Sequence, residues 1–484
     1  MKKIMIHPNL RKVLAAGAVC AALGAGVPSA KAQTTYSWQN VGTSFSDSNN
    51  WSPAGGPPTA LDSVVFNIRT QSMTLSADAE VVNFSSNPSG GAATFTRNGS
   101  GSTNLTLKVT GSLTKDGSQT LVFRQASSDT YKLSLDINHV NLNAGTLAWG
   151  SSTNSNSYVS GVKLGSATIN GGLFQSIVGQ TSGTTEITGN LHFAGSGTVF
   201  IRQRTTSSLA QSGVLSVGSL SSSVGTGVIE VNQLTSGSAV AGLLRLNNAA
   251  GSSAYNGILR DGGTVSVLSV EKNNAGTQVL AGVNTYTGAT TINAGSLLVG
   301  SANVGSLGNT AVTVNAGTLG GTGSIAGTVA VGNGTGTADA LLSAGDGAGS
   351  IGTLTLTNAL SLNADSNFVF EYNGTAATAD QVAANGVTIN AAAVFSFSDI
   401  NPGTLFSGTT FVVINNTSGN AISGTFLNLV NGSTFISGAN EFAVNYSGGV
   451  GGNDLVLTVV PEPATTALLG AGLISVLFFR RRAN

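Results

Sequence analysis

The chain has 484 residues, of which 8% are charged and 66 are glycine, so the charged share lies far below the usual quarter. This composition excludes a charge-rich disordered chain and an architecture built on an acidic or basic tail. Hydrophobic residues make up 41% of the chain and occur in short runs separated by glycine, asparagine and serine. Such runs predict many short strands joined by turns.

The first segment, residues 1–32, has the organisation of a secretory signal peptide. A basic stretch precedes an apolar stretch, and small residues then occur at Ala30 and Ala32. We expect signal peptidase to cut between Ala32 and Gln33. The protein is therefore predicted to be exported.

Cys20 is the only cysteine of the chain. A lipoprotein signal at this cysteine is the alternative, but Val19 precedes it where a small residue is required. Because Cys20 lies in the segment expected to be removed, the exported chain would have neither a disulfide, a thiolate nucleophile nor a cysteine metal ligand. Its stability would then depend on apolar burial and on hydrogen bonds between strands.

Residues 33–69 predict a cap over the N-terminal end of a repeat array, because an open solenoid end exposes unpaired backbone groups. The segment contains two of the three tryptophans, Trp38 and Trp51. It resembles the W…NW…P opening of exported repeat proteins. The alternative is that Trp38 and Trp51 are exposed and form a stacking platform for carbohydrate.

Residues 70–371 are predicted to form the β-helix repeat region. Asparagine and glycine tolerate a positive φ at a corner, after which an aliphatic residue enters the next strand facing inward. This Asn-Ala-Gly-(Thr/Ser)-Leu pattern occurs at 143–147, 293–297 and 315–319, with a looser copy at 170–173. The spacing between the last two full copies, which begin at Asn293 and Asn315, is typical of a solenoid.

No segment between 33 and 460 has sustained helical periodicity. We therefore predict an all-β fold, a right-handed parallel β-helix with an N-terminal cap and a C-terminal β cap or sandwich. At 22 residues a rung, roughly 340 residues would form about 15 rungs and a rod about 70 Å long. A string of antiparallel sandwiches is the alternative.

Residues 280–300 resemble the autotransporter-associated β-strand repeat of passenger domains. The resemblance rests on Asn284, Tyr286, Thr287, Gly288, Thr290 and Gly295-Ser296-Leu297. Similar patterns continue to about residue 371, whereas residues 70–279 are only generically similar. The resemblance implies a parallel β-helix.

Between residues 186 and 230, four charged residues are spaced so that successive rungs could stack them: Glu186, Arg202, Arg204 and Glu230. A polysaccharide lyase or hydrolase needs grouped acidic and basic side chains of this kind. A surface ladder of ion pairs is the alternative, and we favour it. We expect no catalytic residue here.

The two histidines beyond the first segment, His139 and His192, lack metal-ligand spacing. His139 lies near Asp136, and we expect a turn in which both polar groups have partners.

Two glycine-rich segments match ligand-binding patterns only in outline. Gly347–Gly352 fits the dinucleotide pattern G-x-G-x-x-G, but a strand pattern follows where a helix is required. Gly448–Asn453 approaches a calcium-binding nonapeptide, but it has asparagine in place of aspartate and occurs once. We expect neither a cofactor nor a metal site.

Residues 372–459 predict the C-terminal β cap, with strand patterns that begin at Val394, Thr410 and Glu441. The final segment, 460–484, is different in character. Its uncharged run 464–479 predicts an apolar helix about 24 Å long, slightly short of a ~30 Å hydrocarbon core. This marginal span predicts a membrane anchor.

Three features follow one another in this tail: the triplet Pro461-Glu462-Pro463, the apolar run, and the cluster Arg480, Arg481 and Arg482. Together they resemble the PEP-CTERM sorting signal. The resemblance implies recognition by an exosortase, an intramembrane transpeptidase of Gram-negative bacteria that make exopolysaccharide, and cleavage near the triplet. The positive-inside rule keeps the arginines in the cytoplasm. A plain membrane anchor is the alternative.

Without the terminal segments, residues 33–460 carry 12 basic and 19 acidic residues, a formal charge of −7 (12 minus 19). No lysine or arginine occurs between Lys272 and Arg480. Such a chain has no basic stripe to neutralise phosphates, so we expect no nucleic-acid partner.

These features predict an exported, non-catalytic protein of the cell surface or extracellular matrix. It would pass through the inner membrane of a Gram-negative bacterium and then act as a structural or adhesive component associated with biofilm or exopolysaccharide. The expected partners are signal peptidase, exosortase, the membrane through the C-terminal helix, and exopolysaccharide. A polysaccharide-active β-helix enzyme and a membrane-anchored surface protein are the alternatives.

Overall fold

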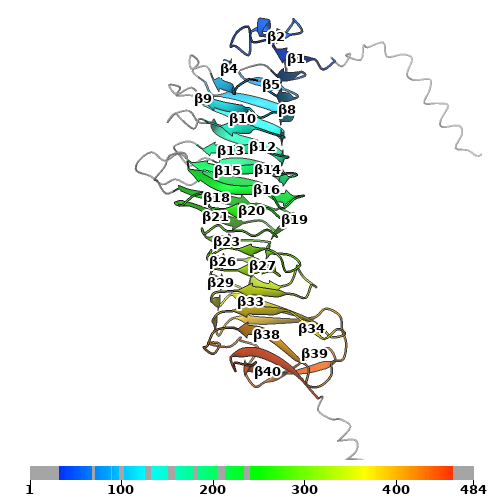
Figure 1. The fold of residues 1–484 in the computed structure, drawn as a ribbon. Coiled ribbons are helices and arrows are strands. Elements are labelled where there is room, and N and C mark those ends of the chain that lie inside the picture. Colours follow the sequence, from blue (N-terminus) through cyan, green and yellow to red (C-terminus); the bar gives the residue numbers. More distant parts are fainter. Residues whose placement is uncertain are drawn as a thin grey trace, which may run out of the picture.

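The structure, a computed structural model, describes residues 32–67, 71–88, 90–97, 103–125, 132–150, 159–178, 184–203, 213–233 and 240–461. These residues form a long stack of strands, in which the sole helix is one short 3-10 turn, η2 (Ser48–Asn50). Figure 1 shows an elongated rod with the N-terminal strands at one end and the C-terminal strands at the other. The predicted all-β parallel solenoid is confirmed. The predicted helix 464–479 lies outside the described residues.

Most of the described strands belong to two stacks, sheet A with 17 strands and sheet B with 8. Sheet A consists of β1 (Thr35–Trp38), β2 (Trp51–Ser52), β3 (Ser63–Phe66), β5 (Ala79–Val81), β6 (Phe84–Ser86), β8 (Leu105–Lys115), β10 (Leu133–Leu142), β12 (Val159–Ile169), β14 (Thr184–Phe193), β16 (Gly213–Ser222), β18 (Val240–Leu246), β21 (Ser266–Lys272), β23 (Thr290–Ile292), β26 (Val312–Val314), β29 (Val329–Val331), β32 (Leu360–Leu362) and β36 (Val387–Ile389). Sheet B consists of β4 (Gln71–Leu75), β7 (Ala93–Arg97), β9 (Thr120–Gln125), β11 (Thr146–Trp149), β13 (Leu173–Val178), β15 (Thr198–Gln203), β17 (Val228–Gln233) and β20 (Ile258–Arg260).

Two further sheets of 8 strands each belong to the second half of the rod. Sheet C consists of β19 (Ser252–Tyr255), β22 (Thr277–Leu280), β24 (Ser296–Val299), β27 (Gly317–Gly321), β30 (Ala340–Ala344), β33 (Ser366–Asn373), β34 (Thr378–Ala379) and β37 (Val394–Asp399). Sheet D consists of β25 (Ser306–Leu307), β28 (Ser324–Ile325), β31 (Thr353–Leu356), β35 (Gln381–Ala384), β38 (Thr410–Asn416), β39 (Thr434–Ser437), β40 (Asn440–Gly448) and β41 (Asp454–Val460).

Alternating side chains explain why the strands stack in parallel around one core. In β10, Leu133, Leu135 and Ile137 are buried and the residues between them face outward. Parallel pairing places Ile137 beside Val109 of one neighbour and Leu164 of the other. A slip of one residue would expose this whole set, so the buried face fixes the register.

The rungs are longer and less regular than the spacing of the last two motif copies predicts. Thr290 pairs with Val312, which preserves that spacing, but Ile187 pairs with Val217 across a clearly longer rung. One reason is strand length, since β10 has 10 residues and β23 has 3. The rod therefore has about 12 turns, fewer than the uniform period predicts.

Parallel pairing continues beyond residue 371. Strand β36 adds to sheet A and β37 adds to β33 of sheet C. The stack then ends in antiparallel pairs, in which β41 lies between β38 and β40, and β39 lies at the outer edge of β40. Figure 1 shows these last strands at the end of the rod opposite to the N-terminal strands.

Aromatic side chains pack in the core near both ends. Trp38 and Trp51 meet edge to face at a centroid distance of 5.0 Å, and both contact Phe66. At the other end Tyr372 packs on Phe442 at 5.4 Å. Each tryptophan is 3% exposed, because both indoles pack over Phe66 at the end of the described stack. The alternative of an exposed carbohydrate platform at Trp38 and Trp51 is therefore wrong.

The corner asparagines of the repeat form ladders along the rod. Each side-chain amide donates to the corner side chain of the preceding rung, and this bonding ties successive turns together. The distances are 2.7 Å for Asn143 to Asp116, 2.6 Å for Asn170 to Asn143, 3.3 Å for Asn273 to Asn247, 3.0 Å for Asn293 to Asn273 and 2.9 Å for Asn315 to Asn293.

A fully buried lysine closes one of these corners. The Nζ of Lys272 donates to the carbonyl oxygens of Asn273, Asn274 and Ala294 at 2.7, 2.7 and 3.2 Å. Gly295 has a φ of +67°, and a Cβ there would lie 2.7 Å from the Nζ. The glycine of the Asn-Ala-Gly motif is thus required both by its backbone conformation and by the lysine beneath it.

Lys115 occupies the same relation to the corner of the earlier Asn-Ala-Gly copy. Its Nζ donates to the carbonyl oxygens of Asp116, Gly117 and Ala144. Burial lowers the pKa of Lys115 and lowers that of Lys272 to about 8. Both lysines therefore serve as donors to corner carbonyls inside the rod.

Candidate ligand-binding groove

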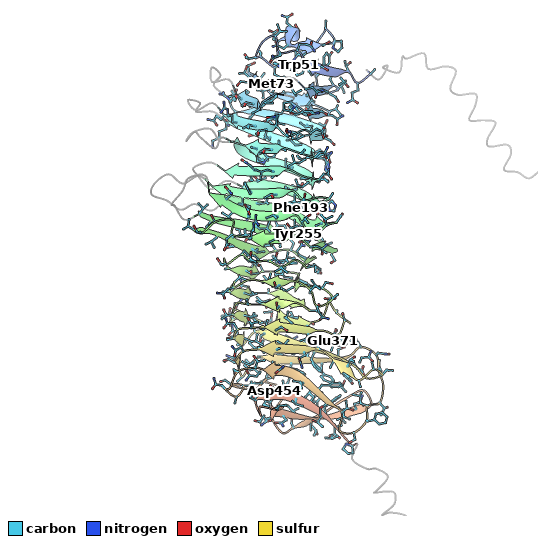
Figure 2. All side chains as sticks on the ribbon, viewed as in Figure 1. Trp51, Met73, Phe193, Tyr255, Glu371 and Asp454 are labelled. Carbon is cyan, nitrogen blue, oxygen red and sulfur yellow. The ribbon has the colours of Figure 1, made fainter. Side chains whose placement is uncertain are left out.

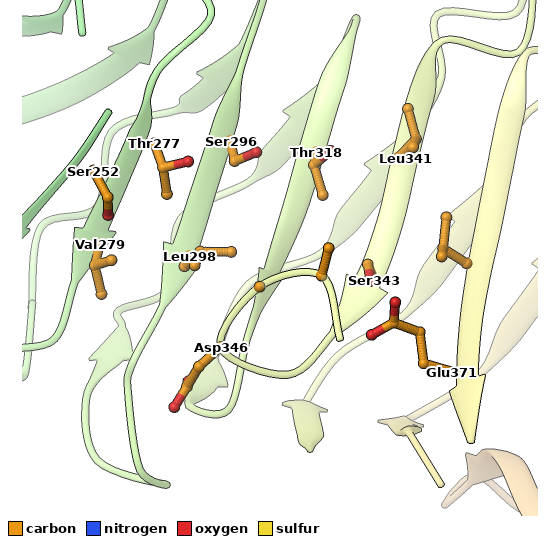
Figure 3. A pocket seen from close by; sticks show the side chains of 13 residues that line it. Ser252, Thr277, Val279, Ser296, Leu298, Thr318, Leu341, Ser343, Asp346 and Glu371 are labelled. Atoms are coloured by element: carbon orange, nitrogen blue, oxygen red, sulfur yellow. The ribbon is translucent and has the colours of Figure 1, made fainter. Parts of the chain in front are cut away.

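A groove follows the outward face of sheet C across six strands, β19, β22, β24, β27, β30 and β33, with a volume of about 450 Å³. At a strand spacing of ~4.8 Å, five intervals give a length of about 24 Å along the rod. Figure 3 shows the strands side by side, with the loop that carries Asp346 crossing over them. The groove is therefore elongated in the direction of the rod.

Two rows of side chains line this groove. In the first row, hydroxyl residues of successive strands are in register: Ser252, Thr277, Ser296 and Thr318. In the second row, two residues further along each strand, Val279 pairs with Leu298 and Ser343 with Val369. The floor of the groove thus combines a row of hydroxyls with a mainly aliphatic row.

The loop over the groove is held at one side by Asp346. Its carboxylate accepts hydrogen bonds from the backbone N–H of Ala302 at 3.1 Å and from the hydroxyls of Thr322 and Ser301 at 3.0 and 3.3 Å. These donors lie on two preceding turns of the chain. The loop is consequently fixed over the groove rather than open to solvent on all sides.

The other side of the loop is held by two buried carboxyl groups. Glu371 accepts from the backbone N–H of Gly349 at 2.7 Å, and Asp380 accepts from those of Gly352 and Glu371 at 2.9 and 3.2 Å. Burial, reinforced by the charge of Glu371, raises the pKa of Asp380 to about 7 against the opposing effect of its two N–H donors. Gly347–Gly352, the segment that matched a dinucleotide pattern, is thus part of the groove wall.

The raised pKa of Asp380 predicts a pH dependence of stability. The folded chain holds this proton up to about pH 7, whereas an unfolded aspartate releases it near pH 3.9, so the free energy of unfolding should fall as pH rises between about 4 and 7. Asp380→Asn should remove this fall, measured as the denaturation midpoint across that range. The control is Asp339→Asn, at an exposed position. An unchanged pH slope in Asp380→Asn would contradict the assignment.

The charged residues that sequence alone placed together lie apart. Glu186 pairs in register with Lys163 on sheet A, whereas Glu230 pairs with Phe200 on sheet B. Strand alternation directs both glutamates away from the core on different sheets of the rod, so the hypothesis of one rung-stacked site is wrong. Glu230 instead forms an ion pair with Arg260 of the next strand. Arg204 lies outside the described residues.

Glu186 belongs to a longer ladder of alternating charge on the outward face of sheet A. The residues that pair in succession are Glu80, Lys108, Asp136, Lys163, Glu186, Ser216, Arg245 and Glu271. Two ion pairs within it have N–O distances of 3.1 Å, Lys108 to Glu80, and 2.8 Å, Arg245 to Glu271. Because like charges directly opposite are unfavourable, this alternation supports the register.

The histidines lie within strands of sheet A rather than in turns. His139 contacts the hydroxyl of Ser166 at 2.6 Å and Oδ1 of Asn141 at 2.9 Å. His192 contacts the hydroxyls of Ser221 and Ser223 at 2.8 and 3.0 Å. The expected turn at His139 is wrong because parallel pairing extends through that residue, but its polar groups do have partners.

A second cavity of about 460 Å³ lies beside the glycine-rich turn 448–453. Here the amide of Asn453 donates to the carbonyl oxygen of Asn416, and Asp454 accepts from the N–H of Asn416 at 2.9 Å. These side chains tie the turn to β38 near the end of the rod, where Asp454 is labelled in Figure 2. The described residues contain no group of three or more His, Cys, Asp or Glu that could hold a metal ion.

The predicted processing residues are mostly beyond the described part of the chain. Ala32 and Gln33 begin that part and Pro461 ends it. Ala30, Glu462, Pro463, Arg480, Arg481 and Arg482 lie outside it. Within the described residues, no helix has the length and apolar character that a membrane crossing requires.

Two family models match the chain. The model of the passenger-associated-transport repeat matches residues 270–299, and that of the PEP-CTERM protein-sorting motif matches residues 459–482. Comparison with curated proteins gives no match. The repeat spans the end of β21 to the end of β24, so it supplies Thr277, Val279, Ser296 and Leu298 of the groove. The chain is thus a parallel β-solenoid with a passenger-associated-transport repeat and a PEP-CTERM protein-sorting motif, features of an exported cell-surface protein.

Proposed function

We propose that the protein is a non-catalytic component of the cell surface or extracellular matrix that binds neutral polysaccharide through the groove on sheet C. Signal peptidase cuts before Gln33, and an exosortase-type system removes the tail near Pro461. The rod then takes part in a biofilm or exopolysaccharide matrix as a structural or adhesive element. The observation that carries this proposal is the elongated groove with one hydroxyl row and one aliphatic row.

The chemistry of the groove suits a glycan chain. A sugar ring presents hydroxyls at its edge and C–H groups on its face, so it can bond to the first row while it covers the second. Specific sites of this kind combine apolar surface with a few placed polar groups. Because carboxylates already hold the loop, little ordering would be needed on binding, which favours affinity.

The charge of this region favours a neutral glycan over an acidic one. No lysine or arginine occurs between Lys272 and Arg480, whereas Asp346 and Glu371 line the groove. A uronate or sulfate would meet only negative charge there, and like-charge contacts are strongly unfavourable. The expected preference is therefore for uncharged polysaccharide.

The carboxylates of the groove have a structural role, which supports binding rather than catalysis. Hydrolysis of a glycosidic bond needs two carboxyl groups directed at one bond, one of them an acid. Asp346 and Glu371 both accept hydrogen bonds that hold the loop. The alternative, a polysaccharide lyase or hydrolase, would need other residues.

Binding is tested with two threonine variants of the same turn. Thr318 lines the groove, and Thr313 faces outward from sheet A shortly before it; both are half-buried. Thr318→Trp should weaken binding of the producer's neutral exopolysaccharide at least about tenfold, the equivalent of ~1.4 kcal/mol, whereas Thr313→Trp should leave it unchanged. Titration calorimetry provides the measurement. Equal affinity in both variants would refute the proposal that the polysaccharide binds in the groove.

The same mixtures test the absence of catalysis. After long incubation with exopolysaccharide, neither reducing ends nor unsaturated products should appear. Release of such products by the purified wild-type chain would establish the enzyme instead.

A further inference from the structure

The end of the rod from which the tail leaves contains a long segment without charge that carries exposed apolar side chains. Not one charged residue occurs from Ile400 to Asn440. This segment carries four large hydrophobic residues with most of their surface in solvent: Phe406 at 89%, Ile436 at 73%, Leu427 at 62% and Val430 at 58%. We call these four residues the terminal face. Exposed apolar side chains mark an interaction site where they gather on one surface.

The terminal face lies beside the last strand. The loop that holds Phe406 bonds to β41 just after that residue, through Gly408 N–H to Val459 O and Val459 N–H to Thr409 O, each at 2.8 Å. Ile436 pairs with Glu441, which in turn pairs with Val460. Phe406 and Ile436 therefore stand within about two strand spacings, ~10 Å, of the residue where β41 ends.

The length of chain that follows limits how far this face can be from a membrane. Only the triplet 461–463 separates β41 from the apolar run that starts at 464. Fully extended, this triplet spans about 10 Å. If the apolar run enters a bilayer, as the proposed sorting function requires, the terminal face must lie close to the lipid surface.

We infer that the terminal face rests on the lipid surface as long as the tail is attached, so that the rod stands end-on. Transfer of phenylalanine and isoleucine side chains from water to the boundary between headgroups and acyl chains lowers the free energy. No basic residue takes part, so the contact is apolar and should be the same on neutral and anionic lipids and insensitive to salt. The groove on sheet C then remains away from the membrane.

Single-cysteine labelling of the exported chain, 33–484, provides the test, because this chain has no cysteine of its own. An environment-sensitive fluorophore is placed by Phe406→Cys and Ile436→Cys. Controls are Val41→Cys, 73% exposed near the other end, and Val283→Cys, 59% exposed along the rod. The proteins are bound to phosphatidylcholine vesicles that contain lipids with a quencher at the acyl-chain boundary.

The expected result is loss of fluorescence at positions 406 and 436 and no loss at 41 and 283, with the same values when phosphatidylglycerol or salt is added. Vesicle-bound protein without quenching at 406 and 436 would overturn the end-on contact and leave the sorting tail intact. Quenching at all four positions would mean that the rod lies flat, which also overturns it. Failure of the protein to float with vesicles would instead refute membrane insertion of the tail. A concentration-dependent spectral shift at 406 without vesicles would assign the face to a second copy of the chain.

Discussion

Replacement of Lys272 by methionine is expected to lower the free energy of unfolding by about 2–4 kcal/mol, because buried carbonyls that lose their donor each cost roughly 1–3 kcal/mol. Methionine has a similar length but no donor, so the oxygens of Asn273, Asn274 and Ala294 would remain inside without a partner from this side chain. Chemical denaturation of the exported chain, followed by circular dichroism, measures the change.

The matched control for Lys272 is Lys163→Met, on the exposed face of sheet A. Exposed ion pairs contribute only about 0–1 kcal/mol, so this variant should stay close to the wild type. If both variants lose the same stability, Lys272 does not hold its corner in the way that the hydrogen bonds indicate.

Replacement of Pro461, Glu462 and Pro463 by alanine is expected to keep the protein in the membrane fraction of the producing cells, whereas the wild type reaches the surface or the medium. The sorting motif would no longer be recognised, while the apolar run and the arginine cluster would still insert. Immunoblots of membrane, surface and medium fractions measure the distribution. Thr465→Ala with Thr466→Ala, which leaves the triplet unchanged, is the control. An identical distribution for the triplet variant and this control would contradict exosortase-type sorting.

Much of the fold could be predicted from sequence because local chemistry determines it. Asparagine and glycine at 143–145 and 293–295 indicate corners wherever they occur, and alternating apolar residues indicate strands with one buried face. The mean period was harder to predict, because the clearest copies, at 293 and 315, come from turns with short strands. The longer rungs, such as the one that leads from Ile187 to Val217, have less regular corner motifs in the sequence.

The groove could not be predicted because it depends on register between turns of unequal length. The hydroxyl row is unevenly spaced in the sequence, at Ser252, Thr277, Ser296 and Thr318, so no fixed period brings these residues together. The one available signal was a serine or threonine at the first or second position of each of these strands. For Glu186 and Glu230 the spacing wrongly predicted that the two residues could lie in one site. Spacing alone does not say which side of the rod a residue occupies.

The tryptophans of the N-terminal segment show how a position in the fold decides between two chemical roles. An indole suits both a carbohydrate platform and a hydrophobic cap. Trp38 and Trp51 lie over Phe66 at the open end of the stack, where burial of a large apolar surface is most favourable. Residue type alone could not distinguish these roles.

Intact mass spectrometry of the wild-type protein from cells and medium tests whether this β-solenoid is exported and sorted to the cell surface. We predict a chain that begins at Gln33 and ends near Pro461, without the apolar run and the arginine cluster. A mature protein whose mass extends to Asn484 would contradict removal of the tail and leave a plain membrane anchor.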